Sequence, residues 1–211
     1  MIAPSTIETS ILLLADISGY TSFLEAVQEA HPEMTQPGGS AAPAYQIVSS
    51  LLETVMTHIA PSFSLLQVEG DALFARGPDR QLSGNGTALV TLVRSAYQAF
   101  RQQLGRGMDQ FRHNCQACMI LPSLDLKFIA HRGIAIQHRI AGRDVLAGAA
   151  VNVAHRLLKN SISARTGLRA YCFVTDAAAE SLGLAAILGQ PYVEDYPDIG
   201  RISGLLIALQ P

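Results

Sequence analysis

Residues 11–23 of the chain read ILLLADISGYTSF, with four aliphatic residues, one carboxylate at Asp16 and a Ser-Gly pair. An apolar run that ends in Ser-Gly is typical of a fully buried strand, and the residues after Gly19 begin an amphipathic helix. An ionised carboxylate at the end of a buried strand is unfavourable unless a cation or hydrogen-bond donors compensate its charge. Asp16 is therefore either a metal ligand or a carboxylate that caps a helix or forms a salt bridge.

The composition is that of a globular protein. Of the 211 residues, 49% are hydrophobic and 15% are charged, and 15 basic against 17 acidic residues leave a formal net charge of −2. Because there is no basic excess and no basic cluster, we do not expect nucleic acid as the main partner. The length predicts one domain over residues 1–211, with a Cys-containing insert at about 105–122. The slight apolar excess favours a homo-oligomer.

The N-terminal residues MIAPSTIETS carry no basic residue ahead of the apolar run. That run is far shorter than the roughly 20 residues needed to span a bilayer. The three cysteines are an odd number and do not make a secreted disulfide framework. We therefore expect a soluble cytoplasmic protein with no membrane partner.

Hydrophobic periodicity predicts an alternation of helices and strands. Helices are expected at residues 20–30, 45–59, 87–104, 149–160 and 176–182. Strands are expected at residues 11–16, 63–68, 72–75, 124–135, 169–174, 192–195 and 202–208, and residues 136–140 are expected to pair with 124–135 through a turn or bend. This order indicates an α+β protein with a ferredoxin-like split βαβ core, an antiparallel-rich sheet and helices on one face.

A second carboxylate, Asp71, lies at the tip of the hairpin predicted at 63–75. In a split βαβ core this hairpin neighbours the first strand, so Asp16 and Asp71 can approach each other. Two carboxylates that close repel and raise each other's pKa unless a divalent cation lies between them. The helix at 149–160 carries a polar stripe with Asn152 and Arg156 at i and i+4, which is either an exposed face or part of a site.

Three segments occur in an informative order: ADISGYTSFL at 15–24, VEGDALFA at 68–75 and DVLAGAAVNVAHRL at 144–157. Together they resemble the catalytic domains of class III adenylate and guanylate cyclases. The similarity is greatest to an uncharacterised stand-alone branch of that superfamily, a domain of unknown function, marked by the HRLLKN helix end and the Cys-containing insert.

The resemblance implies a role for each matching residue. Asp16, Asp71 and the carbonyl of Ile17 would hold two Mg²⁺ or Mn²⁺ ions on a nucleoside triphosphate. The residues that would bind its phosphates at a helix start are Ser18, Gly19, Tyr20 and Thr21. Arg156 would stabilise the transition state and Asn152 would position the ribose, both from the partner subunit of a head-to-tail homodimer.

The base-reading positions depart from the family pattern. Gln67 stands where adenylate-type enzymes have Lys and guanylate-type enzymes have Glu. The other position falls on Val145 without a gap, or on Asp144 with a one-residue insertion. A neutral amide hydrogen-bonds either purine, so the resemblance leaves adenine and guanine open.

A further motif, His113-x-Cys115-x-x-Cys118, has the ligand spacing of a zinc site, which Cys172 or His131 could complete. The alternative is an ordinary loop with two reduced thiols.

The first functional hypothesis is a nucleotide cyclase, a phosphorus-oxygen lyase that forms a 3′,5′-cyclic nucleotide and releases pyrophosphate at the dimer interface. The alternative is a catalytically inactive cyclase-like module that binds nucleotide and regulates another process. A third is a zinc-thiol protein that depends on the Cys-containing insert.

Overall fold

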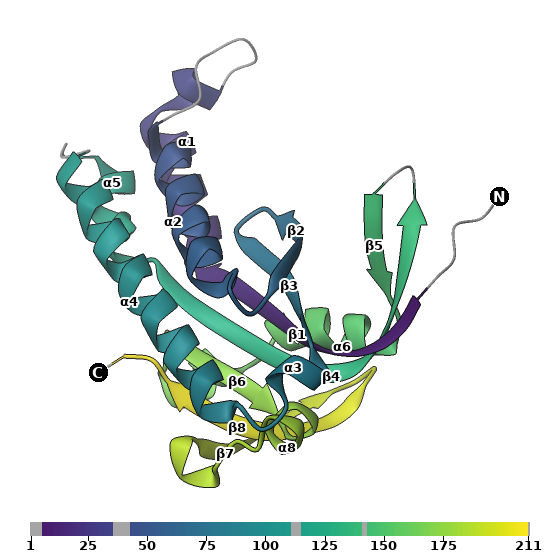
Figure 1. Cartoon of the computed structure of the whole chain (residues 1–211). Helices are drawn as coiled ribbons and strands as arrows, with labels where there is room; N and C mark the ends of the chain where they lie inside the picture. Colours follow the sequence, from purple (N-terminus) through teal and green to yellow (C-terminus); the bar gives the residue numbers. More distant parts are fainter. Residues whose placement is uncertain (1–5, 36–42, 111–114, 141–142, 211) are drawn as a thin grey trace.

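The computed structural model describes residues 6–35, 43–110, 115–140 and 143–210 of the chain (Figure 1). Its strands are β1 (Thr6–Ser18), β2 (Ser64–Glu69), β3 (Ala72–Pro78), β4 (Asp125–Ile140), β5 (Arg143–Ala147), β6 (Tyr171–Thr175), β7 (Gln190–Tyr196) and β8 (Gly200–Ala208). Its α-helices are α1 (Tyr20–Ala30), α2 (Pro43–Ile59), α3 (Asp79–Leu82), α4 (Gly86–Gln110), α5 (Gln116–Ile120), α6 (Ala149–Leu158), α7 (Ile162–Thr166) and α8 (Asp176–Leu182). Short 3₁₀ turns are η1 (Pro32–Thr35), η2 (Leu121–Ser123) and η3 (Ala186–Leu188).

Strand β1 lies inside the sheet because its apolar run is buried on both faces. Ile11 and Leu13 belong to one core cluster, and Leu12 and Leu14 belong to the cluster on the opposite face. Successive side chains of a strand point to opposite faces, so a continuous aliphatic run suits a strand covered on both sides. Strands β3 and β4 flank β1, and both run antiparallel to it.

The strands form one sheet in the order β2-β3-β1-β4-β6-β8-β7, and β5 pairs with the outer part of β4. Strands β4 and β6 are parallel, and every other pairing in the described sheet is antiparallel. The order β2-β3-β1-β4, with helices joining β1 to β2 and β3 to β4, is the split βαβ arrangement. The predicted α+β class and ferredoxin-like core are confirmed.

Helices cover the sheet unequally. Apolar side chains of α1, α2, α4 and α8 form the larger core cluster with one face of the sheet, as predicted. Helix α6 is an exception, because Ala150, Val151, Ala154 and Leu157 pack against Leu12 and Leu14 on the other face. The outward residues of α6 therefore point away from the sheet.

The end of β4 differs from the prediction. Residues 125–140 form one continuous strand, whereas the sequence predicts two strands joined by a bend. The outer half is stabilised by two neighbours, since Gln137 pairs with Thr6 on one side and with Leu146 of β5 on the other. Arg143 begins a strand that the sequence pattern does not indicate.

Among the helices in the described residues, none combines the length with the apolar character needed to cross a bilayer.

Candidate functional site

The two predicted carboxylates lie side by side at one end of the sheet. Asp16 is opposite Ala72 in the β1–β3 pairing. Asp71 directly precedes Ala72 in the chain and lies in the β2–β3 turn. The backbone N–H of Ile17 donates to the carbonyl oxygen of Asp71 over 3.1 Å and ties the turn to the strand end. Gly70 has φ 63°, a left-handed conformation that glycine adopts without strain, and so allows the tight turn. The expected approach of Asp16 and Asp71 is present.

The electrostatics of this pair favour a cation. Burial, and next the neighbouring charge of Asp16, raise the pKa of Asp71 from 3.8 to about 6. Two carboxylates and the nearby carbonyl of Ile17 form an all-oxygen donor set, which suits hard cations such as Mg²⁺ and Mn²⁺. The residues present therefore fit the group that the sequence resemblance implies. In the described part of the chain, no cluster of three or more His, Cys, Asp or Glu side chains offers a different metal site.

Lys127 is a member of this site that the sequence patterns do not indicate. It lies opposite Asp16 in the β1–β4 pairing, and its Nζ atom is 2.9 Å from Asp16 Oδ2. The same ammonium donates to the carbonyl oxygen of Leu158, at the end of α6, over 3.3 Å. From the sequence, Lys127 is a strand residue with a surface or internally satisfied side chain. Only the register between two strands more than a hundred residues apart along the chain reveals its partner.

The predicted phosphate-binding segment opens helix α1 as expected. Ser18 ends β1, Gly19 is the N-cap with φ 87°, and Tyr20 and Thr21 form the first turn. No side-chain cap hydrogen bond forms at the start of this helix. The N–H groups of its first turn, which have no partner within the helix, are therefore not taken up by a capping side chain. The pKa of Tyr20 is raised by burial and by the charge of Asp71, which shows that the helix start lies close to the carboxylate pair.

Besides Lys127, a second positively charged side chain, Arg169, lies beside the turn at Gly19. A Cβ added to Gly19 would be 3.9 Å from an Arg169 guanidinium nitrogen and 3.5 Å from the carbonyl oxygen of Ser123. Arg169 donates to that carbonyl. An added Cβ would therefore make only ordinary contacts, and glycine is favoured here by the left-handed conformation of the turn.

Asn152 and Arg156 lie elsewhere. Both are exposed on α6, on the side opposite the buried Ala154 and Leu157. Arg156 pairs with Asp198 at 2.8 Å, and about half of each side chain is exposed. A surface pair of this kind contributes little to stability, so it leaves the guanidinium accessible. Among the described residues, no hydrogen bond or ion pair joins Asn152 or Arg156 to Asp16 or Asp71, although the end of α6 shares Lys127 with Asp16.

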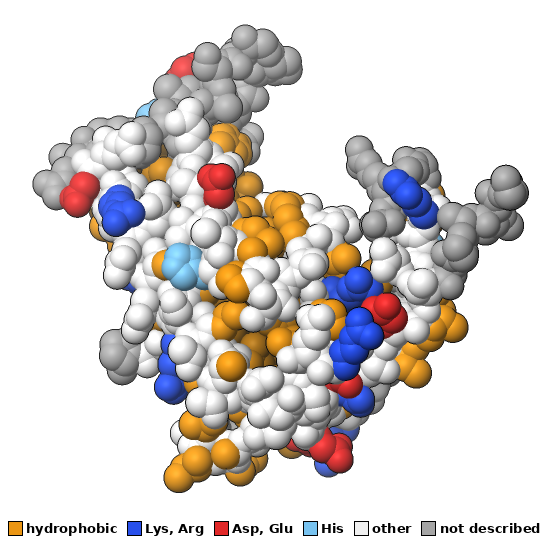
Figure 2. Space-filling view, in the orientation of Figure 1, with side chains coloured by type: hydrophobic (Ala, Val, Ile, Leu, Met, Phe, Trp, Pro, Cys, Tyr) orange, Lys and Arg blue, Asp and Glu red, His pale blue; other side chains and the backbone are white. Residues whose placement is uncertain are grey.

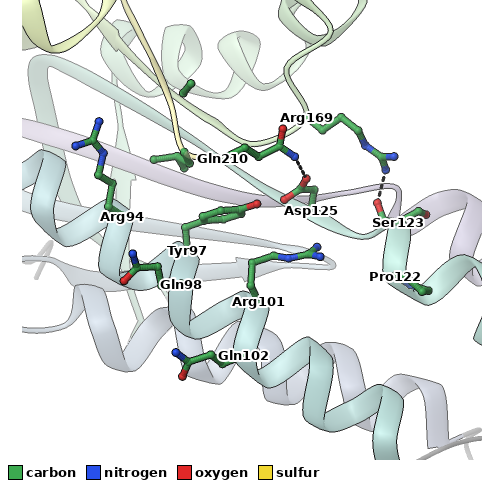
Figure 3. Close-up of a pocket in the computed structure, with 12 residues that line it drawn as sticks. Arg94, Tyr97, Gln98, Arg101, Gln102, Pro122, Ser123, Asp125, Arg169 and Gln210 are labelled. Atoms are coloured by element: carbon green, nitrogen blue, oxygen red, sulfur yellow. Dashed lines mark hydrogen bonds between the residues drawn. The ribbon is translucent and has the colours of Figure 1, made fainter.

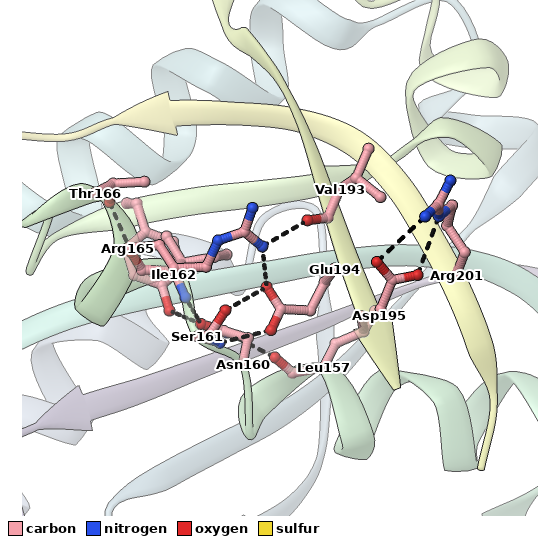
Figure 4. A network of polar contacts seen from close by, with 11 residues as sticks. Leu157, Asn160, Ser161, Ile162, Arg165, Thr166, Val193, Glu194, Asp195 and Arg201 are labelled. Carbon is pink, nitrogen blue, oxygen red and sulfur yellow. Dashed lines mark hydrogen bonds and ion pairs between the residues drawn. The ribbon is translucent and has the colours of Figure 1, made fainter. Parts of the chain in front are cut away.

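A buried polar network lies at the junction of α6 and α7 (Figure 4). The carboxylate of Glu194, only 5% exposed, accepts hydrogen bonds from Ser161 N over 2.7 Å and from Ser161 Oγ over 3.1 Å, and Ser161 is the N-cap of α7. The guanidinium of Arg165, in α7, lies 3.9 Å from a Glu194 carboxylate oxygen. Asn160 donates to the carbonyl of Leu157 at the end of α6 and accepts from the Tyr171 hydroxyl. Glu194 therefore holds the start of α7, and Asn160 links it to the end of α6.

The two base-reading candidates lie on β2 and β5, which are not adjacent in the sheet. Gln67 is exposed in β2, next to an irregularity in its pairing with β3. The backbone of Asp144 is in β5, opposite Arg139 of β4. Strands β2 and β5 are in contact, so the two positions lie on the same side of the molecule.

The candidate zinc motif is only partly within the described residues, because His113 lies outside them. Burial opposes ionisation of Cys115, but hydrogen bonds from Cys118 and His31 outweigh it and lower the pKa of this thiol. Cys172 is fully buried in β6, and burial raises the pKa of its thiol to about 12. His131 contacts Thr175 instead, at 3.1 Å. Neither completes a metal-binding cluster with the cysteines in the part of the chain that is described.

A pocket of about 910 Å³ lies between α4, the start of β4 and the end of β8 (Figure 3). Its buried carboxylate, Asp125, accepts hydrogen bonds from Leu126 N and from the Gln210 side chain. Two of its arginines, Arg101 and Arg169, donate to backbone carbonyls, and a third, Arg94, also lines the pocket. None of the predicted site residues lines it.

Comparison with solved structures identifies the fold. A bacterial light-regulated adenylyl cyclase matches with a TM-score of 0.63 and 15% identity, over 96% of this chain and 53% of that one. The chain thus spans about half of that larger protein. The guanylyl cyclase Cya2 matches with a TM-score of 0.68 and 15% identity, over 98% of this chain and 94% of that one. Likeness at this identity establishes the fold, which is that of nucleotide cyclase catalytic domains.

Sequence comparison identifies the family. The chain is 30% identical over 161 residues to the uncharacterized protein Rv2561/Rv2562 of Mycobacterium tuberculosis, covering 74% of this chain and 70% of that protein. Residues 48–166, more than half of the chain, match the family described as protein of unknown function DUF2652. The chain therefore belongs to the DUF2652 family, and within the structure its candidate site is the end of the sheet where Asp16, Asp71 and the start of α1 meet.

Proposed function

We propose that the protein is a nucleotide cyclase, which binds a nucleoside triphosphate with divalent cations and converts it to a 3′,5′-cyclic nucleotide. The observation that carries the proposal is the Asp16–Asp71 pair, joined by the Ile17–Asp71 backbone bond and placed beside the uncapped start of α1. The cyclase-like fold supports the same assignment.

In the proposed reaction, the ribose 3′-oxygen forms a bond to the α-phosphorus. The bond from the α-phosphorus to the oxygen that bridges to the β-phosphorus breaks, pyrophosphate leaves, and the hydroxyl proton passes to solvent. Asp16, Asp71 and the Ile17 carbonyl are the residues that would hold Mg²⁺ or Mn²⁺. Bound there, these ions would lower the pKa of the attacking hydroxyl and offset the charge of the leaving group.

The start of α1 supplies the phosphate end of the site. The N–H groups of Tyr20 and Thr21 and the positive end of the helix dipole suit an anion. Gly19 leaves room for close approach, because no side chain projects from the turn.

The remaining groups come, in this proposal, from a second copy of the chain. Asn152 and Arg156 are exposed on the outer side of α6, and Arg156 pairs with Asp198 and not with the carboxylates of the same chain. Large apolar side chains are exposed nearby on β1, β2, β4 and β5, where a second copy would cover them: Ile7, Leu65, Val68, Ile134, Ile140 and Val145. Figure 2 shows apolar side chains gathered in the hollow between the α1–α2 side of the molecule and the β4–β5 arm.

We propose the cytoplasm as the site of action, since the three cysteines are free thiols and fit a reducing compartment. The base stays open, because Gln67 is an exposed neutral amide that hydrogen-bonds either purine.

The test is pyrophosphate release from ATP, GTP, CTP and UTP, each with Mg²⁺ and with Mn²⁺, compared with an Asp71→Asn control. We expect release from a purine nucleotide, a cyclic product identified by mass spectrometry, and loss of both in the control. Binding of nucleotide without any product would instead identify a cyclase-like module that does not turn over.

A further inference from the structure

The ammonium of Lys127 occupies the position of a cation in the candidate metal site. Its Nζ atom lies 2.9 Å from Asp16 Oδ2, and less than a fifth of either side chain is exposed (18% and 17%). Its positive charge also acts on Asp71, whose pKa it lowers in opposition to burial and to Asp16. One ammonium therefore partly neutralises both carboxylates.

Three features hold the ammonium in this place. The β1–β4 register sets Lys127 directly across from Asp16. The carbonyl of Leu158 accepts a second hydrogen bond from Nζ, and it is one of the terminal carbonyls of α6 that have no partner within the helix. The C-terminal end of a helix carries a partial negative charge, which also favours a cation.

The ammonium and a metal ion compete for Asp16. Lys127 contacts only Oδ2 of Asp16, so an ion bound to the other oxygen would lie within a few ångströms of Nζ. Two positive charges that close repel strongly in a partly buried site, so the ammonium weakens direct binding of a divalent cation to Asp16.

We propose that Lys127 is a built-in counter-ion that competes with a divalent metal for Asp16, and that it sets the concentration of free metal at which the site fills. The inference rests on the proposed function, because it requires Asp16 and Asp71 to be the metal ligands. Free metal alone binds weakly, since the ammonium repels it and already neutralises part of the charge of Asp16. Metal that arrives with a triphosphate binds more strongly, because the phosphates offer the ammonium new negative partners.

The first test is Mn²⁺ binding without nucleotide, followed by electron paramagnetic resonance of the free ion. Lys127→Met, which keeps the length of the side chain and removes its charge, is expected to bind Mn²⁺ at least about tenfold more tightly than the wild type. Lys159→Met is the matched control, because Lys159 is exposed next to Leu158 and is the only other lysine of the chain. It is expected to leave Mn²⁺ affinity unchanged.

The second test uses the wild-type chain and does not depend on a variant that folds. Lysine labelled with ¹³C at Cε gives two resonances, one for each lysine. As Mg²⁺ is added, the Lys127 resonance is expected to shift while that of Lys159 stays in place. Metal binding that moves neither resonance overturns the inference.

Failure of the inference is distinguishable from failure of the proposed function. If Asp71→Asn abolishes Mn²⁺ binding while Lys127→Met binds with wild-type affinity, the metal site stands and the role of Lys127 is wrong. If Asp71→Asn binds Mn²⁺ as the wild type does, the metal ligands themselves are wrongly assigned.

Discussion

Asp71 lies partly buried in the β2–β3 turn, next to the second carboxylate at Asp16. Burial and this neighbour raise its pKa to about 6, while the turn and the strand end hold it in place. Without a metal, the folded protein therefore binds a proton at Asp71 more tightly than the unfolded chain does. The energetic cost of the site is measurable as a dependence of stability on pH.

Stability should fall as pH rises from about 4 to about 6. In this window the folded state holds more protons than the unfolded state, so the free energy of unfolding decreases with pH, and the penalty is fully present above pH 6. Asp71→Asn removes the titrating group and is expected to flatten this part of the profile. Because Asp71 is only partly buried, we expect the variant to gain about 1 kcal/mol in the free energy of unfolding at pH 7, which is less than the full value of the pKa shift. Urea unfolding of the wild type and of Asp71→Asn in EDTA, at pH 4.5 and at pH 7, measures the pH dependence and the gain in stability. An equal change of the free energy of unfolding between the two pH values in both proteins would contradict the prediction.

At the scale of elements, the start of α1 depends on one glycine. Gly19 has φ 87°, and a side chain there would also approach Ser123 and Arg169. Gly19→Ala is expected to lower the free energy of unfolding by roughly 1 kcal/mol or more. Gly105→Ala is the matched control, since Gly105 lies within α4 with open space around it, and alanine there should stabilise by about 0.5–1 kcal/mol. Chemical denaturation measures the change in the free energy of unfolding, which should be negative for Gly19→Ala and positive for Gly105→Ala. Equal changes in the two variants would show that the conformation of Gly19 is unimportant.

The start of α7 depends on Glu194, whose carboxylate binds the N-cap residue Ser161. Glu194→Gln keeps the shape but weakens these charge-assisted hydrogen bonds, so we expect a loss of about 1–3 kcal/mol in the free energy of unfolding. The next residue provides the control. Asp195 pairs with Arg201 at 3.0 Å, but both side chains are mostly exposed, so Asp195→Asn should leave stability unchanged within error. Hydrogen exchange of the α7 amides should rise in Glu194→Gln alone, and equal exchange in the two variants would contradict this role.

The sequence predicts those parts of the fold that local patterns determine. Strand β1 follows from Ile11–Leu14, and α8 begins and ends as predicted. Strand β5 is missed, because Arg143 and Asp144 are polar and the strand is stabilised by pairing with β4 rather than by burial of an apolar run. The Lys127–Asp16 contact is missed for a related reason, since it depends on register between distant strands.

The predicted site residues of the molecule form two groups. One group is Asp16, Asp71 and the start of α1, and the other is Asn152 and Arg156, which are exposed on α6. In the proposed dimer, the second group of one chain serves the carboxylates of the other, so a twofold dimer contains two equivalent sites.

Mixing two inactive variants tests this arrangement. Asp71→Asn disables one half-site and Arg156→Ala the other, so each variant alone should release no pyrophosphate. A dimer with one chain of each kind keeps one complete site, made of Asp16 and Asp71 from one chain and Arg156 from the other. With random exchange of chains, half of the dimers are mixed and half of their sites are intact, so the mixture should regain about a quarter of wild-type activity. A mixture of Asp71→Asn with Asp16→Asn, both in the same half-site, is the control and should regain none. Activity of Arg156→Ala alone, or no recovery on mixing in dimers that are shown to exchange, would place the whole reaction within one chain or outside this site.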